Sequence, residues 1–227
     1  MTARSIAVIA VMLAGLALGS STALAAAETL PAVTQDGLHL YKQTRDRVVY
    51  IKPGATFTQY KQVAILDCYI EFSKDWVKSY NRDQRDLSRK IKDSDLERAK
   101  TGLQSAFKKI FTEELEKGGR YKVVDSGGPD VLVLRPGLIN IQVSAPDLMS
   151  ASRSATYIQS AGSMTIYLEL LDSASDTLLA RVIDASVDPD RYRQRASSVG
   201  NRAAAERMMQ SWASELRKRL DLVEGGG

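Results

Sequence analysis

A cysteine thiol and a histidine imidazole can act as a nucleophile and its base, and each residue occurs once in the 227 residues. Cys68 follows Asp67 in the apolar run VAILDCYIEF at residues 63–72, and His39 precedes the first clear strand. A cysteine hydrolase needs a base that generates the thiolate. Because side chains alternate between the two faces of a strand, Cys68 lies on an apolar face and Asp67 on the other. We predict that Cys68 is a small buried apolar residue and not a nucleophile.

Other site chemistry has little support in the sequence. Asp67 and Glu71 share one face of the run and could do general acid–base work, but they more simply mark where the strand meets solvent. Zinc sites need clusters of cysteine and histidine, and calcium loops need carboxylates at alternating positions around a glycine. Phosphate loops need a set glycine spacing before a helix. We therefore predict no catalytic residue, no metal and no cofactor.

A polar stretch at residues 73–93 places aromatic side chains among charges. Aromatic faces beside cations could hold a sugar, a peptide or a lipid headgroup. The predicted contact residues in this stretch are Trp76, Tyr80 and Arg82. The alternative is that Trp76 and Tyr80 only pack across an edge of the sheet.

A second polar stretch, RYRQR at residues 191–195, is basic. Its charge could attract anionic lipid or an acidic partner. The predicted contact residues are Arg191, Arg193 and Arg195, and the alternative is a solvated connector. Over the whole chain, Lys and Arg number 31 against 27 Asp and Glu. Nucleic-acid binders concentrate a larger basic surplus on one face, so we predict that the chain binds no nucleic acid.

The N-terminus predicts export. Arg4 precedes an apolar stretch at residues 6–18, and small residues follow it. This order is typical of a secretory signal peptide, here residues 1–25, with cleavage after Ala25 or, alternatively, Ala27. The stretch is shorter than the about 20 residues that a membrane span needs, and we predict no transmembrane segment in the mature chain. No Arg-Arg pair precedes it, which favours Sec export to the periplasm.

The elements that must position these residues follow from apolar periodicity. We predict a flexible leader at residues 26–45 and one domain at residues 46–223. Strands are expected at residues 47–52, 62–72, 120–125, 130–143, 164–172 and 177–187, and helices at 94–117 and 201–222. Ser94 and Glu97 fit a capping box at the first helix. The predicted fold class is α+β, with a mostly antiparallel or mixed sheet of about five to six strands packed against two long helices.

Three stretches carry a family resemblance: VYIKPGATFTQYKQVAI at residues 49–65, YLELLDSASDTLLARVID at 167–184 and WASELRKRLD at 212–221. They resemble the bacterial envelope family known as domain of unknown function 3313, over about residues 48–221. The resemblance implies a periplasmic, lipoprotein-like chain and supplies no catalytic residues. The sequence departs from the family in two places. No cysteine that could bear a lipid precedes Cys68, and the turn near Asp176 lacks the expected glycine.

Together these observations predict an exported, non-enzymatic accessory or binding protein of the bacterial cell envelope. Its expected partner is an envelope protein, a lipid headgroup or a glycan, and association with the membrane stays open, as does the oligomeric state. The alternative is an uncharacterised envelope enzyme that uses carboxylates.

Overall fold

Strand β6 (Val131–Val143) lies in the interior of an eight-stranded mixed sheet. The computed structural model describes residues 30–143, 157–158, 162–187, 194–195 and 198–222. The chain divides into two units, residues 1–30 and 31–227, and the architecture below is that of the second unit.

The main sheet has the strand order β1-β2-β9-β8-β6-β3-β5, and β4 also pairs with β6. Neighbours from β1 to β6 are antiparallel, whereas β3 and β4 run parallel to β6, and β5 runs parallel to β3. The other strands are β1 (His39–Gln43), β2 (Arg47–Ile51), β3 (Gln62–Ile65), β4 (Tyr69–Phe72), β5 (Lys122–Val124), β8 (Gly162–Asp172) and β9 (Leu178–Val187), while β7 (Tyr157–Ile158) and β10 (Gln194–Arg195) pair separately.

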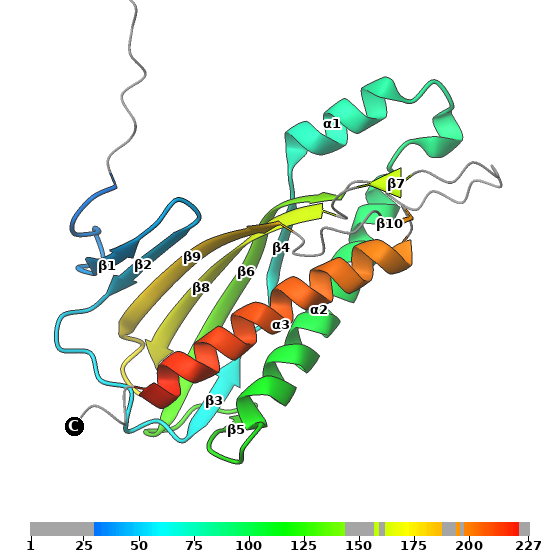
Figure 1. Ribbon diagram of the computed structural model, residues 1–227. Coiled ribbons are helices and arrows are strands. Elements are labelled where there is room, and N and C mark those ends of the chain that lie inside the picture. Colours follow the sequence, from blue (N-terminus) through cyan, green and yellow to red (C-terminus); the bar gives the residue numbers. More distant parts are fainter. Residues whose placement is uncertain (1–29, 144–156, 159–161, 188–193, 196–197, 223–227) are drawn as a thin grey trace, which may run out of the picture. The chain divides into compact units, whose positions relative to one another are not determined.

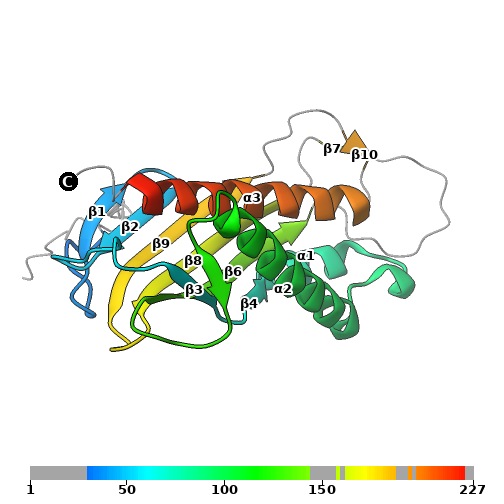
Figure 2. The same cartoon turned by 90° about the horizontal axis from the view of Figure 1, so that it is seen from below.

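Two long helices, α2 (Asp93–Glu116) and α3 (Ser198–Leu222), pack against each other and cover one face of the sheet (Figures 1 and 2). The helix α2 contacts β4 and β5, and α3 contacts β8. Buried Glu114 of α2 accepts hydrogen bonds from Gln210 (2.7 Å) and Arg217 (3.1 Å) of α3, which ties the two helices together. The core beneath them includes Phe107, Phe111, Leu134, Leu138, Ile166, Leu168 and Met209.

The predicted strand at residues 62–72 is two strands, because β3 ends at Ile65 and β4 begins at Tyr69. Both pair with β6, and the break faces Pro136. The carbonyl of Leu134 accepts from Leu66 N–H on this side, and residues two apart in a strand present their backbone to the same side. Pro136 therefore lacks its N–H where the partner strand is interrupted.

The polar stretch at residues 73–93 contains a helix that periodicity did not predict, α1 (Lys74–Asp83), followed by a short 3-10 turn at Leu87–Arg89. The Ser73 hydroxyl accepts from the Trp76 N–H at 3.3 Å and caps the helix. Its apolar stripe is only one or two turns long, because Trp76 and Tyr80 are its large members.

The predicted α+β class with a mixed sheet is confirmed, with corrections. The sheet has eight strands instead of about five to six, and the described residues hold three α-helices instead of two. Strand β1 lies within the predicted leader at residues 26–45. The start of α2 also differs from the predicted capping box of Ser94 and Glu97. The helix begins at Asp93, and the carboxylate of Asp95 accepts a hydrogen bond from the Lys92 N–H. In the β8–β9 turn, Asp176 adopts the left-handed conformation (φ 53°) that glycine would favour.

Candidate functional site

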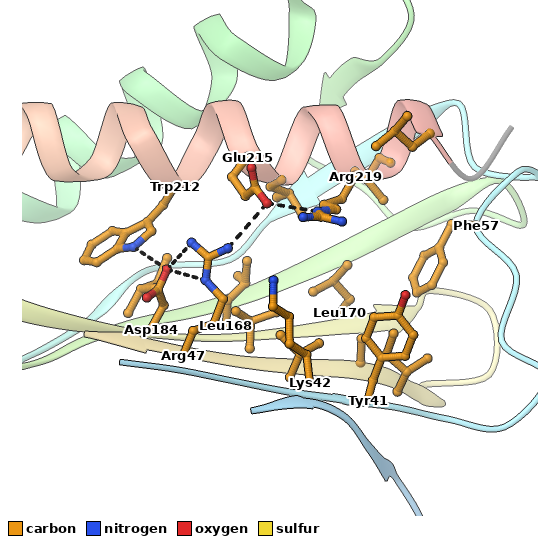
Figure 3. A pocket seen from close by; sticks show the side chains of 18 residues that line it. Tyr41, Lys42, Arg47, Phe57, Leu168, Leu170, Asp184, Trp212, Glu215 and Arg219 are labelled. Atoms are coloured by element: carbon orange, nitrogen blue, oxygen red, sulfur yellow. Dashed lines mark hydrogen bonds and ion pairs between the residues drawn. The ribbon is translucent and has the colours of Figure 1, made fainter. Parts of the chain in front are cut away.

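A cavity of about 310 Å³ opens between the C-terminal half of α3 and the helix-covered face of β2, β9 and β8 (Figure 3). Strand register explains its apolar floor, since paired residues on neighbouring strands point to the same face. One row joins Val49, Val182 and Leu168, and the next joins Ile51, Ala180 and Leu170. All six line the cavity, which therefore has an aliphatic floor two rows deep.

An ion pair bounds the floor at one end. The row beside Val49 joins Arg47 to Asp184, whose Oδ2 lies 2.6 and 2.9 Å from two guanidinium nitrogens of Arg47. The same oxygen accepts from the Trp212 indole N–H of α3 at 3.1 Å. Asp184 is buried, and its partners come from both the sheet and the helix. The carboxylate therefore fixes this end of the cavity.

The ion pair continues into α3. Arg47 lies 3.4 Å from Glu215, which also accepts from Arg219 at 2.9 Å (Figure 3). Burial lowers the pKa of Arg47, but the hydrogen bond and charge of Asp184 more than offset this, and the pKa lies above its ordinary value. The hydrogen bond from Arg219 holds the pKa of Glu215 below its ordinary value. Both groups are therefore charged at neutral pH.

A β-bulge places Lys42 at the mouth of the cavity. In β1, Leu40 pairs with Tyr50, and the register then shifts so that Lys42 pairs with Val49. In a regular hairpin Lys42 would pair with Val48 and point to the opposite face. The extra residue, Tyr41, brings both side chains to the cavity side. Figure 3 shows the Lys42 ammonium raised from the strand toward α3.

The structure places the predicted contact residues elsewhere. Trp76 donates from its indole nitrogen to the Val143 carbonyl at 3.0 Å, and its ring lies 6.1 Å from that of Phe72 and 6.2 Å from that of Tyr80. The structure thus brings Trp76 and Tyr80 together in a packed cluster. Burial raises the pKa of Tyr80. Arg82 is exposed, 3.7 Å from Asp83.

The basic stretch falls largely outside the part of the chain that the structure describes. Arg191 and Arg193 lie outside it, and only the backbone of Arg195 is described, in β10. Trp76 also borders a second cavity, of about 450 Å³, between the N-terminal halves of α2 and α3. That cavity adjoins Val143 and Gly162, where the described chain is interrupted.

The predicted burial of Cys68 is confirmed, since 3% of its surface is exposed. Burial raises the pKa of its thiol to about 12. Exposed His39 lies in β1, and the strands β2, β9, β8 and β6 separate it from β4. Asp67 and Glu71 are not on one strand, because Asp67 lies in the break before β4. No group of three potential metal-binding side chains occurs among the described residues.

The sequence did contain one signal for the cavity. Asp184 follows Ala180 and Val182 on the same face of β9, and a buried acid needs a cation. Its partner Arg47 is 137 positions away, and nothing in the sequence identifies it. The bulge that turns Lys42 is equally hidden, since no glycine or proline marks it.

The chain is an α+β protein whose long helices cover one face of the sheet. Its cavity has an aliphatic floor and charged side chains at the edge. The chain belongs to the family described as Protein of unknown function (DUF3313), whose profile matches residues 34–216. The search of curated proteins finds no match.

Solved structures that match do so distantly. The PelC dodecamer from Paraburkholderia phytofirmans has 11% identity and a TM-score of 0.36, over 73% of this chain and 96% of that one. A DUF330 protein from Xanthomonas campestris has 13% identity and a TM-score of 0.35, over 73% and 86% of the two chains. A PDZ domain protein from Parabacteroides distasonis has 11% identity and a TM-score of 0.37, over 75% and 34%. Among the described helices, none combines the length and apolar character of a membrane span.

Proposed function

We propose that the protein is an exported, non-enzymatic binding protein of the bacterial cell envelope, and that the cavity between α3 and the sheet is its ligand site. The observation that carries the proposal is the cavity beside α3, whose floor is aliphatic and where Val49, Ile51 and Val182 are only partly buried. Burying such surface is worth about 25 cal/mol per Å². An apolar ligand would therefore gain free energy by filling the cavity.

The polar end favours binding over catalysis. A general acid needs a carboxyl group whose pKa is raised toward neutrality. Here Arg219 lowers the pKa of Glu215, while Asp184 forms an ion pair with Arg47 and accepts hydrogen bonds from Arg47 and Trp212. Both carboxylates hold the wall in place, which suits a preformed binding site.

Export is supported by the N-terminal signal pattern and by the family resemblance. Fractionation of cells that express the full chain should recover the protein, shortened at its N-terminus, with the periplasmic contents. Recovery of the full-length chain in the cytoplasm would contradict this part of the proposal.

Filling the cavity tests the binding site. Val182→Phe adds a ring to the floor, whereas Ile183→Phe, the matched control, points from the next residue of β9 to the opposite face. In a Trp76→Phe background the fluorescence of Trp212 reports on the cavity alone, and dodecanol serves as a neutral alkyl probe.

We expect the parent and Ile183→Phe to bind dodecanol and Val182→Phe to lose binding, because the ring occupies the same space. Circular dichroism and thermal unfolding would verify that both variants fold. Equal binding by the two folded variants would show that dodecanol does not enter the cavity.

A further inference from the structure

The size of the cavity between α3 and the sheet limits its occupant to one chain. Its volume of about 310 Å³ is at the lower end of the roughly 300–1,000 Å³ of small-molecule sites. At about 30 Å³ for each water-sized group, it holds roughly ten such groups. The floor rows Val49–Val182–Leu168 and Ile51–Ala180–Leu170 offer only aliphatic contacts. A single medium-length alkyl chain fits both the volume and the chemistry.

The charged side chains that line the cavity include one more cation than anions. Three cations (Lys42, Arg47 and Arg219) and two carboxylates (Asp184 and Glu215) line it. Arg47 is held by Asp184, and Arg219 by Glu215. The Lys42 side chain has no hydrogen bond or ion pair to any residue that the structure describes, and it is exposed at the mouth.

The position of the surplus charge is set by the backbone. The bulge in β1 turns Lys42 to the cavity side, opposite Val49. Bulges are frequent next to functional sites, where they redirect a side chain. Arg219 lies at the mouth as well, with 58% of its side chain exposed. An unpaired ammonium and a partly exposed guanidinium therefore stand together at the open end of an aliphatic cavity.

We propose that the cavity binds a single-chain anionic amphiphile. The alkyl chain lies on the floor of β2, β9 and β8, and the anionic headgroup lies at the mouth, where Lys42 is its main partner and Arg219 a second one. This inference rests on the proposed function and names the ligand class of the same site. A free fatty acid and a lysophospholipid with an anionic headgroup share this chemistry.

A series of probes with the same twelve-carbon chain tests the charge preference. Laurate is anionic, dodecanol neutral and dodecyltrimethylammonium cationic, and each is titrated below its micellar concentration against the full mature chain. We expect laurate to bind about fivefold more tightly than dodecanol at low salt, as for one partly exposed ion pair. The difference should shrink at high salt because exposed charges are screened, and the cation should bind most weakly.

Lys42→Met keeps the apolar stem and removes the charge. It should remove most of the preference for laurate over dodecanol, since Lys42 is the main partner of the headgroup. The matched control is Lys52→Met, an exposed lysine next to β2 that does not line the cavity, and it should keep the preference. A titration with a lauroyl lysophosphatidylglycerol distinguishes the two ligand types. Tighter binding of this lipid than of laurate would indicate a lysophospholipid, and tighter binding of laurate would indicate a free fatty acid.

Three results would overturn the inference. The first is equal affinity for the three probes, and the second is a preference for laurate that Lys42→Met does not diminish. Either would leave the binding site itself in place. The third, no binding of any alkyl probe to the folded protein, would overturn the proposed function together with this inference.

Discussion

At the scale of single residues, Asp184 organises the candidate site. Its buried carboxylate binds Arg47 from β2 and Trp212 from α3, so one side chain joins a sheet strand to the covering helix. Because each strong donor is satisfied, the polar end needs no ligand to stay in place. Lys42 differs in lacking such a partner among the described side chains, and this difference separates the fixed wall of the cavity from its charge-selecting mouth.

Cys68 gives a residue-scale prediction about reactivity. The buried thiol, whose pKa burial raises to about 12, should react slowly with a thiol reagent in the native protein and quickly in denaturant. Cys68→Ala should cost about 1 kcal/mol of stability by leaving a small cavity. It should not change alkyl binding, since Cys68 does not line the cavity beneath α3. Rapid labelling of the native protein would show that the thiol is accessible.

At the scale of elements, Pro136 shows what the sequence could not predict. The run at residues 62–72 has the alternation of one strand, and a local pattern gives no reason to divide it. The break lies opposite Pro136 of the neighbouring strand β6. Because proline has no backbone N–H, β6 cannot donate a hydrogen bond to a partner strand at that point. By contrast, α2 and α3 were predicted because long helices carry a repeating apolar stripe of their own.

A second ionic cluster joins three strands on the sheet face opposite the helices. Glu169 of β8 lies 2.6 Å from Arg135 of β6 and 2.7 Å from Arg181 of β9, and it accepts from the Tyr167 hydroxyl at 3.0 Å. Burial raises the pKa of Glu169, but these hydrogen bonds lower it more, and the net pKa lies below its ordinary value. The ionised side chain therefore stabilises the folded sheet.

This cluster predicts how stability depends on pH. Since the folded pKa lies below the unfolded value of about 4.3, the contribution of Glu169 is complete above that pH and is lost as the pH falls through the folded pKa. Glu169→Gln should cost about 1.5–3 kcal/mol at pH 7 and should flatten the loss of stability in acid, as measured by urea unfolding. Glu71→Gln, at a half-buried carboxylate 3.8 Å from the Lys74 ammonium, should change both much less. A Glu169→Gln variant that keeps the acid dependence of the parent would contradict this assignment.

At the scale of the whole molecule, the cavity follows from geometry. Strands are spaced about 4.8 Å apart, and a helix is about 10 Å wide, so two helices cover about four of the seven strand positions in the sheet. Since α2 contacts β4 and β5 and α3 contacts β8, the apolar face of β9 and β2 is left beside the helix. The sequence predicted the layers, but the cavity depends on how widely the sheet extends beyond them.

The most direct test of the central claim is a crystal structure of the mature protein with laurate. The account predicts an alkyl chain in contact with Val182 and Leu168, and a carboxylate about 3 Å from the Lys42 ammonium. A bound laurate at any other place, or a cavity that side chains fill in the presence of excess laurate, would contradict the claim that this is the ligand site.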